Sequence, residues 1–515
     1  MRIATNREMQ CQAGPDFFRR EQLVRSGNKL PELLAGASLL LSGIAAPALS
    51  AGSPAGRQPN IVLIYIDDMG YGDLSCFGAT QYKTPNLDRM ASQGMRFTNF
   101  YVSQAVCSAS RAGLLTGCYS NRVGITGALM PTAKIGLNPT EETIAEVLKK
   151  QKYRTAAIGK WHLGHHREFL PLQQGFDEYT GLPYSNDMWP VFYDGTRNVA
   201  QAYSRKLAYP ELPLIKGNDK VRELKTLDDQ SELTTLYTET AVDFIKRNKS
   251  NPFFLYLAHS MCHVPLAVSD KFKGKSEQGL FGDVLMEIDW SVGEILKTLE
   301  QTGLSGNTLV IFASDNGPWL NFGNHAGSTG GLRQGKGTSF EGGQRVPCLM
   351  KWPGVIPEGV ICNKLAATID ILPTLAAITG APLPEKQIDG VNILPLMKGD
   401  SGAEPRQYLY YYYQKNSLEA VRKGNWKLVL PHKYRSYEGV MPGKDGYPGE
   451  YAQTETTLAL YDMRRDPGER YDVKEFYPEV VEELMKLVEQ AREDLGDDLT
   501  GRPGKNRREP GKTEI

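Results

Sequence analysis

Apolar runs and helical patterns alternate along residues 58–400 of the chain. Asn60–Ile66 is a continuous apolar run rich in β-branched residues, which predicts a strand buried on both faces of a sheet. Similar short runs predict strands at Thr155–Gly159, Phe253–Ala258 and Thr308–Ser314. Because strands that alternate with helices are typical of an α/β fold, we expect a large mixed, mostly parallel sheet sandwiched by helices.

Two segments carry the signals of a helix start. Thr84–Gly94 has Thr as its N-cap, Pro in the first turn and Gly at its end, which predicts a helix. Asn138–Glu141 carries the same kind of start signal, with Asn as the N-cap, Pro next to it and Glu three residues after the cap. An apolar stripe follows at Ile144, Val147 and Leu148. We therefore expect a second helix that begins at Asn138.

The pattern changes after residue 400. Tyr408–Tyr413 and Trp426–Leu430 are strand-like and flank Lys423-Gly424-Asn425, so we expect a hairpin-like pair, followed by an amphipathic helix at Glu479–Leu495. The residues from Thr500 on are rich in Gly, Pro and charge, which predicts disorder. The predicted organisation is a leader at 1–57, a main catalytic domain at 58–400, a C-terminal α+β subdomain with a small antiparallel sheet and a helix at 401–499, and a disordered tail at 500–515.

The first 57 residues differ in composition from the rest. A pair of arginines precedes an apolar, small-residue stretch from Leu30 to Leu49, and Ala48–Ala51 suits cleavage by signal peptidase. The stretch is typical of a signal-peptide core rather than of a stable membrane span. Phe18–Leu23 loosely resembles a twin-arginine signal, although Gln22 stands where an apolar residue is usual. We expect an exported protein, periplasmic or secreted; a disordered extension is the alternative.

The overall composition excludes some classes of protein. The chain has 515 residues, of which 41% are hydrophobic and 23% charged, and its formal net charge is +0. A nucleic-acid partner requires a basic excess, so none is expected. The seven cysteines are sparse, odd in number and without Cys-x-x-Cys spacing, which indicates neither a disulfide scaffold nor a zinc site. No stretch beyond the leader is apolar enough to predict a membrane span in the mature protein.

Polar residues follow four of the predicted strands, at the point where each strand ends. The strands lead in turn to Asp67-Asp68, Lys160-Trp161-His162, His263 and Asp315-Asn316. Ligands of open α/β sheets bind outside the carboxyl ends of the strands. We therefore expect these side chains to share one site.

The acidic members of this set indicate a metal ion. Asp67, Asp68, Asp315 and Asn316 offer only oxygen ligands, which suit Ca²⁺ or Mg²⁺ far better than Zn²⁺. A single Asp at a strand end is often a helix cap or an Asx turn. Adjacent acids repel each other unless a cation or a donor lies between them, so the sequence favours a bound divalent cation.

Cys107 opens the run Cys107–Gly117, which predicts a short helix. Helix N-termini concentrate free N–H groups and positive dipole, which favour a thiolate or an oxyanion. Arg111 lies four residues further on and adds a cation. Cys107 is therefore a candidate nucleophile with an arginine that stabilises an anion.

Four further basic residues are candidates for the same site. Lys160 and Lys336 suit an anionic substrate, and Lys336 lies in the flexible surround Gly335-Lys336-Gly337. His162 and His263 suit proton transfer near neutral pH. The plainer alternatives are solvated surface charges for the lysines and structural roles for the histidines.

These motifs together resemble the formylglycine-dependent sulfatases of the arylsulfatase type, within the alkaline phosphatase superfamily. The matching segments follow the family's order over residues 58–475: Asn60–Gly72, Cys107–Gly117, Gly159–Gly164, His263–Leu266, Ser314–Gly317, Gly335–Gly343, Arg345–Pro347, Val421–Leu428 and Leu460–Asp462. Cys107 and Arg111 fit the family's Cys-x-Pro-x-Arg signature, with Ala109 in place of Pro. The outline is most similar to relatives of arylsulfatase A and N-acetylgalactosamine-6-sulfatase.

The resemblance implies an alkaline phosphatase-like fold and an enzyme that hydrolyses sulfate esters. A formylglycine-generating enzyme would act transiently on Cys107 and oxidise it to Cα-formylglycine, whose hydrate attacks sulfur. The implied ligands of one divalent cation, Ca²⁺ or else Mg²⁺, are Asp67, Asp68, Asp315, Asn316 and the modified Cys107. The other implied roles are sulfate binding by Lys160, His263 and Lys336, stabilisation of the hydrate by Arg111, and regeneration of the aldehyde by His162.

The substrate and two alternative functions stay open at this point. The resemblance implies a sulfated carbohydrate, a glycolipid or an aryl sulfate, and the loop with Tyr184, Asn186, Asp187 and Trp189 either lines a sugar pocket or packs on the core. One alternative is a phosphate or phosphonate ester hydrolase of the same superfamily, which usually has Ser or Thr as nucleophile. The other is a binder of sulfated glycans without catalytic activity.

Overall fold

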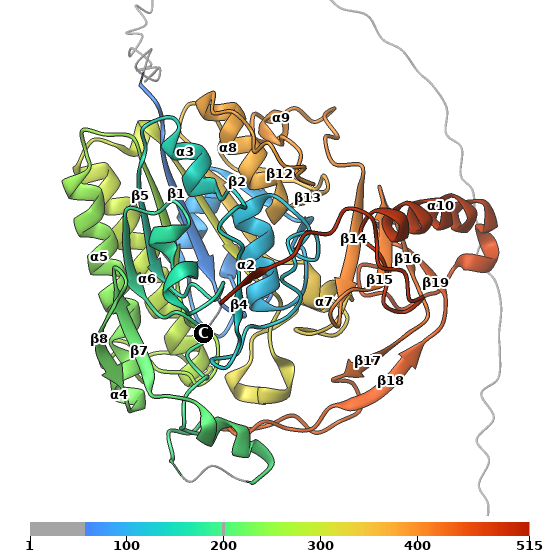
Figure 1. Ribbon diagram of the computed structural model, residues 1–515, viewed down its shortest axis with the longest axis horizontal. Helices are drawn as coiled ribbons and strands as arrows, with labels where there is room; N and C mark the ends of the chain where they lie inside the picture. The colour runs from blue at the N-terminus through green and yellow to red at the C-terminus, as the bar shows by residue number, and fades with distance from the viewer. Residues whose placement is uncertain (1–56, 198–200, 514–515) are drawn as a thin grey trace, which may run out of the picture. The chain divides into compact units, whose positions relative to one another are not determined.

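A ten-stranded mixed sheet organises the protein in the computed structural model, which describes residues 57–197 and 201–513 (Figure 1). In spatial order its strands are β12 (Val360–Cys362), β2 (Met95–Phe97), β11 (Cys348–Lys351), β10 (Thr308–Ser314), β1 (Asn60–Ile66), β9 (Phe253–Ala258), β5 (Arg154–Gly159), β6 (Glu178–Gly181), β7 (Leu212–Lys216) and β8 (Asp219–Leu224). The predicted fold class is confirmed.

The middle of the sheet is parallel and its flanks are antiparallel. Strands β10, β1, β9, β5 and β6 run parallel, whereas β11 and β2 on one side and β7 and β8 on the other run antiparallel to their inner neighbours. The register aligns Ile61 with Phe254 and Leu309. The four strands predicted from the sequence are thus direct neighbours, and their carboxyl ends meet at one edge.

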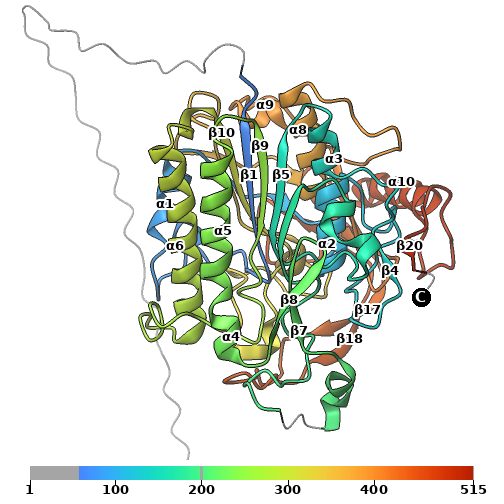
Figure 2. The ribbon, with the colours of Figure 1, turned by 60° about the vertical axis from the view of Figure 1, so that its left-hand side comes forward.

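Helices cover both faces of the sheet because its central strands are buried along nearly their whole length and point apolar side chains to both sides. In β1, Ile61, Leu63 and Tyr65 join one hydrophobic cluster, and the alternate residues Val62 and Ile64 join another. Figure 2 shows α1 (Pro85–Ser92), α5 (Leu233–Arg247) and α6 (Leu280–Gln301) on one face and α2 (Cys107–Thr116), α3 (Ile144–Lys149), α8 (Ile371–Thr379) and α9 (Leu394–Met397) on the other. The shorter helices are α4 (Leu227–Ser231) and α7 (Glu341–Gln344).

The C-terminal part forms a second, antiparallel sheet. Its order is β14 (Tyr408–Tyr413), β15 (Ser417–Lys423), β16 (Trp426–Val429) and β19 (Ala459–Asp462), and α10 (Pro478–Asp494) packs on it. The predicted small sheet with a helix is confirmed. The predicted pairing of Tyr408–Tyr413 with Trp426–Leu430 is wrong, because β15 lies between them and makes the hairpin with β16.

Three two-stranded sheets complete the described structure. They are β13 (Ala366–Ala367) with β3 (Phe100–Tyr101), β17 (His432–Ser436) with β18 (Ala452–Thr456), and β20 (Gly511–Lys512) with β4 (Ile135–Gly136). The prediction of a disordered tail is wrong for residues 500–513. Arg508 makes two hydrogen bonds of 2.8 Å to Glu141, and β20 pairs with β4.

One predicted helix begins later than expected. The helix at Thr84 is confirmed as α1, but α3 begins at Ile144 rather than at Asn138. The Asn138 side chain instead accepts hydrogen bonds from Thr140 in a local turn, and Thr143 and Glu146 form the capping box. Both segments carry a cap signal, and the one that directly precedes the apolar stripe starts the helix.

Residues from Arg57 on belong to one compact unit, so the division at residue 400 stays a prediction. The leader lies outside the described residues. Within the described ranges, no helix is long and apolar enough to cross a membrane.

Candidate active site

The edge where the four neighbouring strands end opens into a cavity of about 290 Å³. Cys107, His162, His263 and Lys336 line it, together with residues of the segments 185–209 and 413–435. The loop between β17 and β18 reaches the segment that contains Asp194, to which the Tyr447 hydroxyl donates a hydrogen bond (Figure 1). Side chains far apart in the sequence therefore enclose a single site.

Three carboxylates and an amide gather beneath the cavity, as the strand ends predict. The backbone of Asp68 is left-handed, with φ 60°, and its N–H donates to Asp315 Oδ1 at 3.1 Å. Successive side chains of an extended chain point to opposite sides, so this turn is what lets both Asp67 and Asp68 join one cluster. Asn316 Nδ2 donates to Asp68 Oδ1 at 2.7 Å.

Each carboxylate has a cationic partner. Lys160 Nζ lies 2.5 Å from Asp67 Oδ2, Lys336 Nζ lies 2.7 Å from Asp68 Oδ1, and the Arg111 guanidinium binds Asp315 Oδ2 at 2.8 and 3.0 Å. Gly159, with φ 106°, turns the chain so that Lys160 enters the site directly after β5. A Cβ on residue 159 would lie 1.9 Å from the Ala258 oxygen, so only glycine fits there.

The buried charges shift each other's pKa in different directions. Burial favours the neutral form of Asp67, but Lys160, His263 and Arg111 outweigh it and lower the pKa of that carboxyl. Burial and the nearby charge of Asp67 raise the pKa of Asp315. The site holds its carboxylates ionised only while enough positive charge surrounds them.

The donor set fits a hard divalent cation. Ligand atoms of Asp67, Asp68, Cys107 and His263 lie within 4.8 Å of one another. The Oδ1 atom of Asn316 is buried without a hydrogen-bond partner, although a buried carbonyl oxygen is normally satisfied. Carboxylate and amide oxygens are the ligands that Ca²⁺ and Mg²⁺ prefer.

Cys107 is the first residue of α2, and its Sγ lies 3.4 Å from Asp67 Oδ1 and 3.4 Å from Lys336 Nζ. The expectation that the helix N-terminus favours a thiolate is not met. Burial raises the pKa of the Cys107 thiol, and the charge of Asp67 raises it further. An unmodified Cys107 is therefore a poor nucleophile.

Hydrogen bonds to backbone carbonyls define the tautomers of the two candidate histidines. A carbonyl only accepts, so His162 donates through Nε2 to Leu129 at 3.0 Å and leaves a bare Nδ1, which is buried without a partner. His263 donates through Nδ1 to the Val264 carbonyl at 2.5 Å, which leaves Nε2 bare and 3.6 Å from Asp68 Oδ2. Both rings offer one free nitrogen to the site.

The sulfatase family model matches residues 59–381, well over half of the chain. This chain belongs to the sulfatase family. A second model, described as N-sulphoglucosamine sulphohydrolase, C-terminal, matches residues 335–494 of this sulfatase. The family is one of hydrolases, so the chain is an enzyme and the resemblance seen in its motifs is confirmed.

Relatives of known name cover nearly the whole chain. Arylsulfatase A of Homo sapiens is 39% identical over 463 residues, which cover 85% of this sulfatase and 89% of the relative. N-acetylgalactosamine-6-sulfatase of Mus musculus is 37% identical over 502 residues, or 92% of each chain. The crystal structure of PsFucS1 sulfatase from Pseudoalteromonas sp. superposes with a TM-score of 0.77 at 27% identity and covers 88% of this chain and 93% of its own.

The structure brings all ten residues singled out from the sequence into one cluster. The predicted sugar loop divides instead. Asp187 lines the cavity, whereas Trp189 is fully buried in the hydrophobic core and Asn186 bonds to the His263 and Pro265 carbonyls. Tyr184 is also buried in that core.

Several lining residues were missed by the sequence reasoning. Ser185 accepts a hydrogen bond of 3.2 Å from Lys160, and Gln104, Tyr413 and Arg435 line the cavity. Ser185 follows β6 at the same sheet edge, so the rule of strand ends predicts its position once β6 is recognised. The position of Arg435 depends on how the C-terminal subdomain packs.

Proposed function

We propose that this sulfatase hydrolyses sulfate esters with a Cα-formylglycine generated from Cys107 and a divalent cation, Ca²⁺ or Mg²⁺, held by Asp67, Asp68, Asp315 and Asn316. The observation that carries the proposal is the position of Cys107. It lies at the start of a helix, between the carboxylate cluster and the cavity, with a thiol that burial keeps protonated. The family signature at this position supports conversion by a formylglycine-generating enzyme.

The hydrated formylglycine supplies a nucleophilic hydroxyl, and the cation supplies positive charge for the sulfuryl oxygens. Lys160 and Lys336 bind carboxylates here; a cation held by Asp67 and Asp68 would neutralise these carboxylates, and the two ammonium groups would then be available to the sulfate. Arg111 is fully buried and holds Asp315 through two hydrogen bonds, so it orients that carboxylate beside residue 107.

The two histidines divide the proton transfers. His162 presents a bare Nδ1, so it accepts a proton from the residue at position 107. His263 Nε2 is the free nitrogen on the other side of the cluster, and in its protonated form it delivers a proton to the departing alcohol. Asn186 bonds to the backbone of His263 and keeps that loop in place.

The substrate class follows from the relatives. Their names indicate aryl sulfates and N-acetylgalactosamine 6-sulfate, and we propose a sulfated carbohydrate, a glycolipid or an aryl sulfate for this chain. Export to the periplasm or cell exterior, predicted from the leader, suits a glycan that lies outside the cell.

The test compares 4-nitrophenyl sulfate with 4-nitrophenyl phosphate, using protein co-produced with a formylglycine-generating enzyme. We expect sulfate turnover that Cys107→Ala abolishes, whereas Cys76→Ala, a thiol outside the cavity, leaves it unchanged. Phosphate turnover above sulfate turnover would favour the phosphate ester hydrolase. No turnover with retained binding of a sulfated glycan would favour the non-catalytic binder.

A further inference from the structure

One wall of the active-site cavity comes from the C-terminal part of the chain and carries positive charge. Tyr413–Lys415 reach the cavity from the turn between β14 and β15, and Arg435 reaches it from β17. Arg205 and Lys206 of the 3₁₀ helix at Gln201–Ala208 line it as well. Asp187 is the only carboxylate among the described lining residues. The cavity thus has more positive charge than a single sulfate requires.

Arg435 is the central cation of this wall. No carboxylate of the described residues pairs with it, whereas Lys336 binds Asp68. The neighbours of Arg435 are the neutral phenols of Tyr413, Tyr437 and Tyr451; it hydrogen-bonds to Tyr437, and the Tyr451 ring lies 4.9 Å from the guanidinium carbon. A half-buried guanidinium with five N–H groups and no acid beside it keeps those that do not bond to Tyr437 available to an anionic ligand.

The position of Arg435 is coupled to that of the sulfate-binding loop. The Tyr437 hydroxyl donates to the Lys336 carbonyl at 2.7 Å, and Gln334 accepts from the Tyr437 N–H at 2.9 Å. Gly337 makes the close approach feasible, because a Cβ there would lie 3.2 Å from Arg435 Nε. The guanidinium is therefore held beside Lys336 by the fold.

The turn that carries Lys415 is held in an uncommon conformation. Gln414 and Lys415 both have positive φ angles, 46° and 71°. Gln104, three residues before Cys107, donates from Nε2 to the Lys415 carbonyl at 3.1 Å, and buried Asn416 bonds to the Leu495 carbonyl at 2.9 Å. Non-glycine residues persist in this region only where the surroundings hold them, and such sites gather at ligand-binding positions.

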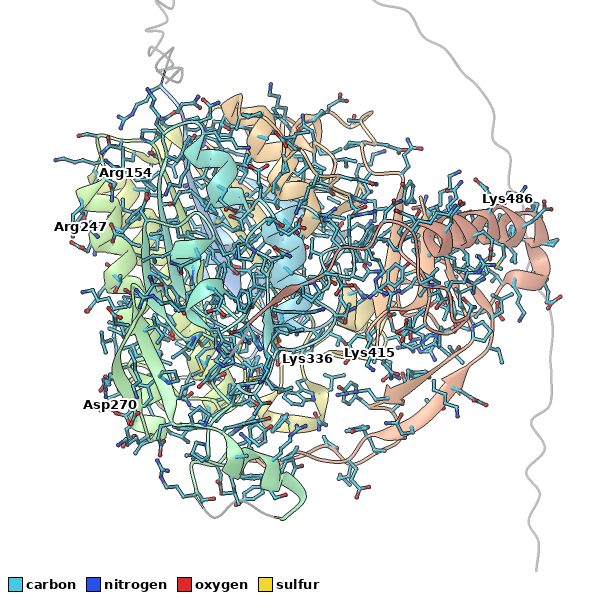
Figure 3. The ribbon with its side chains drawn as sticks, in the orientation of Figure 1. Arg154, Arg247, Asp270, Lys336, Lys415 and Lys486 are labelled. Atoms are coloured by element: carbon cyan, nitrogen blue, oxygen red, sulfur yellow. The ribbon has the colours of Figure 1, made fainter. Side chains whose placement is uncertain are left out.

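The side-chain oxygen of Gln104 at this wall lacks a partner. The Oε1 atom of Gln104 is buried without a hydrogen bond, and Gln104 lines the cavity. Lys336 and Lys415 lie close together in Figure 3, where the C-terminal sheet meets the catalytic half. An amide oxygen can accept a hydrogen bond from a sugar hydroxyl, and the adjacent cations can bind an anionic group. This wall therefore has the chemistry to bind a charged sugar.

We propose that Arg435 and Lys415 form a second anion subsite, which binds a carboxylate or a second sulfate of the substrate next to the sulfate that is cleaved. The natural substrate is then a polyanionic sulfated glycan rather than one with a single charge. This inference rests on the proposed function, in which Lys160, Lys336 and His263 bind the sulfate that leaves.

The test compares four substrates: 4-nitrophenyl sulfate, a monosulfated N-acetylhexosamine, the same N-acetylhexosamine with a second sulfate, and a disaccharide that joins the monosulfated N-acetylhexosamine to a hexuronate. We expect Arg435→Gln to lower kcat/KM by about 10-fold to 100-fold on at least one of the two polyanionic substrates, since hydrogen bonds to charged groups are the strong ones. The two singly charged substrates should lose less than about threefold. Whether the disulfated or the uronate substrate is affected identifies the second anion.

Lys433→Gln is the matched control, because Lys433 lies two residues earlier on β17, is exposed and does not line the cavity. It should leave all four rates unchanged, whereas Lys415→Gln should act in the same direction as Arg435→Gln. An equal loss on singly and multiply charged substrates, or no loss on any, would overturn the subsite.

Failure of the proposed function gives a different result. In that case no substrate is turned over by the parent enzyme, and the subsite is tested by calorimetry of the two polyanionic sugars binding to the chain with Cys107→Ala. Weaker binding of either sugar after Arg435→Gln supports the subsite, and unchanged binding of both refutes it.

Discussion

Replacing Lys427 with methionine removes a cation that lies between two buried carboxylates. Lys427 is fully buried, and its Nζ lies 3.1 Å from Glu341 and 2.8 Å from Glu469. It also donates to the Ser339 carbonyl at 2.9 Å. Because Ser339 and Glu341 belong to the segment that follows Lys336, this side chain connects β16 of the C-terminal sheet to the catalytic half.

The expected loss is large because Lys427 is the cation nearest to both buried acids. Burial opposes ionisation of Glu341, yet Lys427, together with Arg422 and Arg345, lowers its pKa to about 2. Burial raises the pKa of Glu469 even with Lys427 beside it. Removing one partner of a buried ion pair typically destabilises a protein by about 3–5 kcal/mol, and we expect a loss in that range.

The pH dependence gives the prediction a second readout. Without Lys427 the pKa of each acid rises in the folded state, so the folded protein holds protons that the unfolded chain releases. The stability deficit should therefore grow as the pH rises from 5 to 8. Equilibrium unfolding in urea at several pH values measures both the size and the slope.

Lys423→Met is the matched control, because Lys423 and Glu483 form an exposed ion pair, with about half of each side chain accessible. We expect it to lose less than about 1 kcal/mol. A loss for Lys427→Met no larger than for Lys423→Met, or one that shrinks as the pH rises, would refute the reasoning.

Three further predictions concern the metal site, a buried acid and the tail. Asn316→Ala should weaken Ca²⁺ binding at least about tenfold by calorimetry, because Asn316 Oδ1 lacks any other partner; unchanged affinity would remove it from the ligand set. Burial raises the pKa of Glu419 from 4.5 to about 8, so the stability of the protein should fall as the pH rises between these values. Glu419→Gln should make the melting temperature less dependent on pH in this range. An unaltered pH dependence would contradict this. Arg508→Gln should lower the free energy of unfolding in urea by about 1–3 kcal/mol, because buried Glu141 loses its bidentate partner. Arg507 is exposed, so Arg507→Gln is the control. An effect of Arg508→Gln no larger than that of the control would mean that the tail does not dock in solution.

The central strands were predictable because their sequence patterns need no tertiary information. Three strands have the predicted bounds: Asn60–Ile66, Phe253–Ala258 and Thr308–Ser314. A strand buried on both faces is a continuous apolar run, and this pattern is visible in the sequence without knowledge of its neighbours. The rule that ligands bind at strand ends then predicted that the candidate residues lie together, and they do so because these strands are neighbours.

Apart from the start of α3, where two local cap signals compete, the failures depend on partners distant in the sequence. Ser417–Lys423 mixes charged and apolar residues and was missed, although Arg422 is buried against Tyr101 and Glu341 in the fold. The tail looked disordered because nothing in its own composition shows that Arg508 meets Glu141. Likewise, the helix position of Cys107 suggested a thiolate, but burial beside Asp67 decides its pKa.

The most direct test of the account is peptide mass spectrometry across Cys107, on protein co-produced with a formylglycine-generating enzyme. We predict the mass of an aldehyde at position 107 and its loss in an Arg111→Ala variant, because Arg111 belongs to the Cys-x-Ala-x-Arg run that we propose as the recognition signal of the modifying enzyme. A fully reduced, unmodified cysteine at position 107 in active enzyme would contradict the formylglycine mechanism.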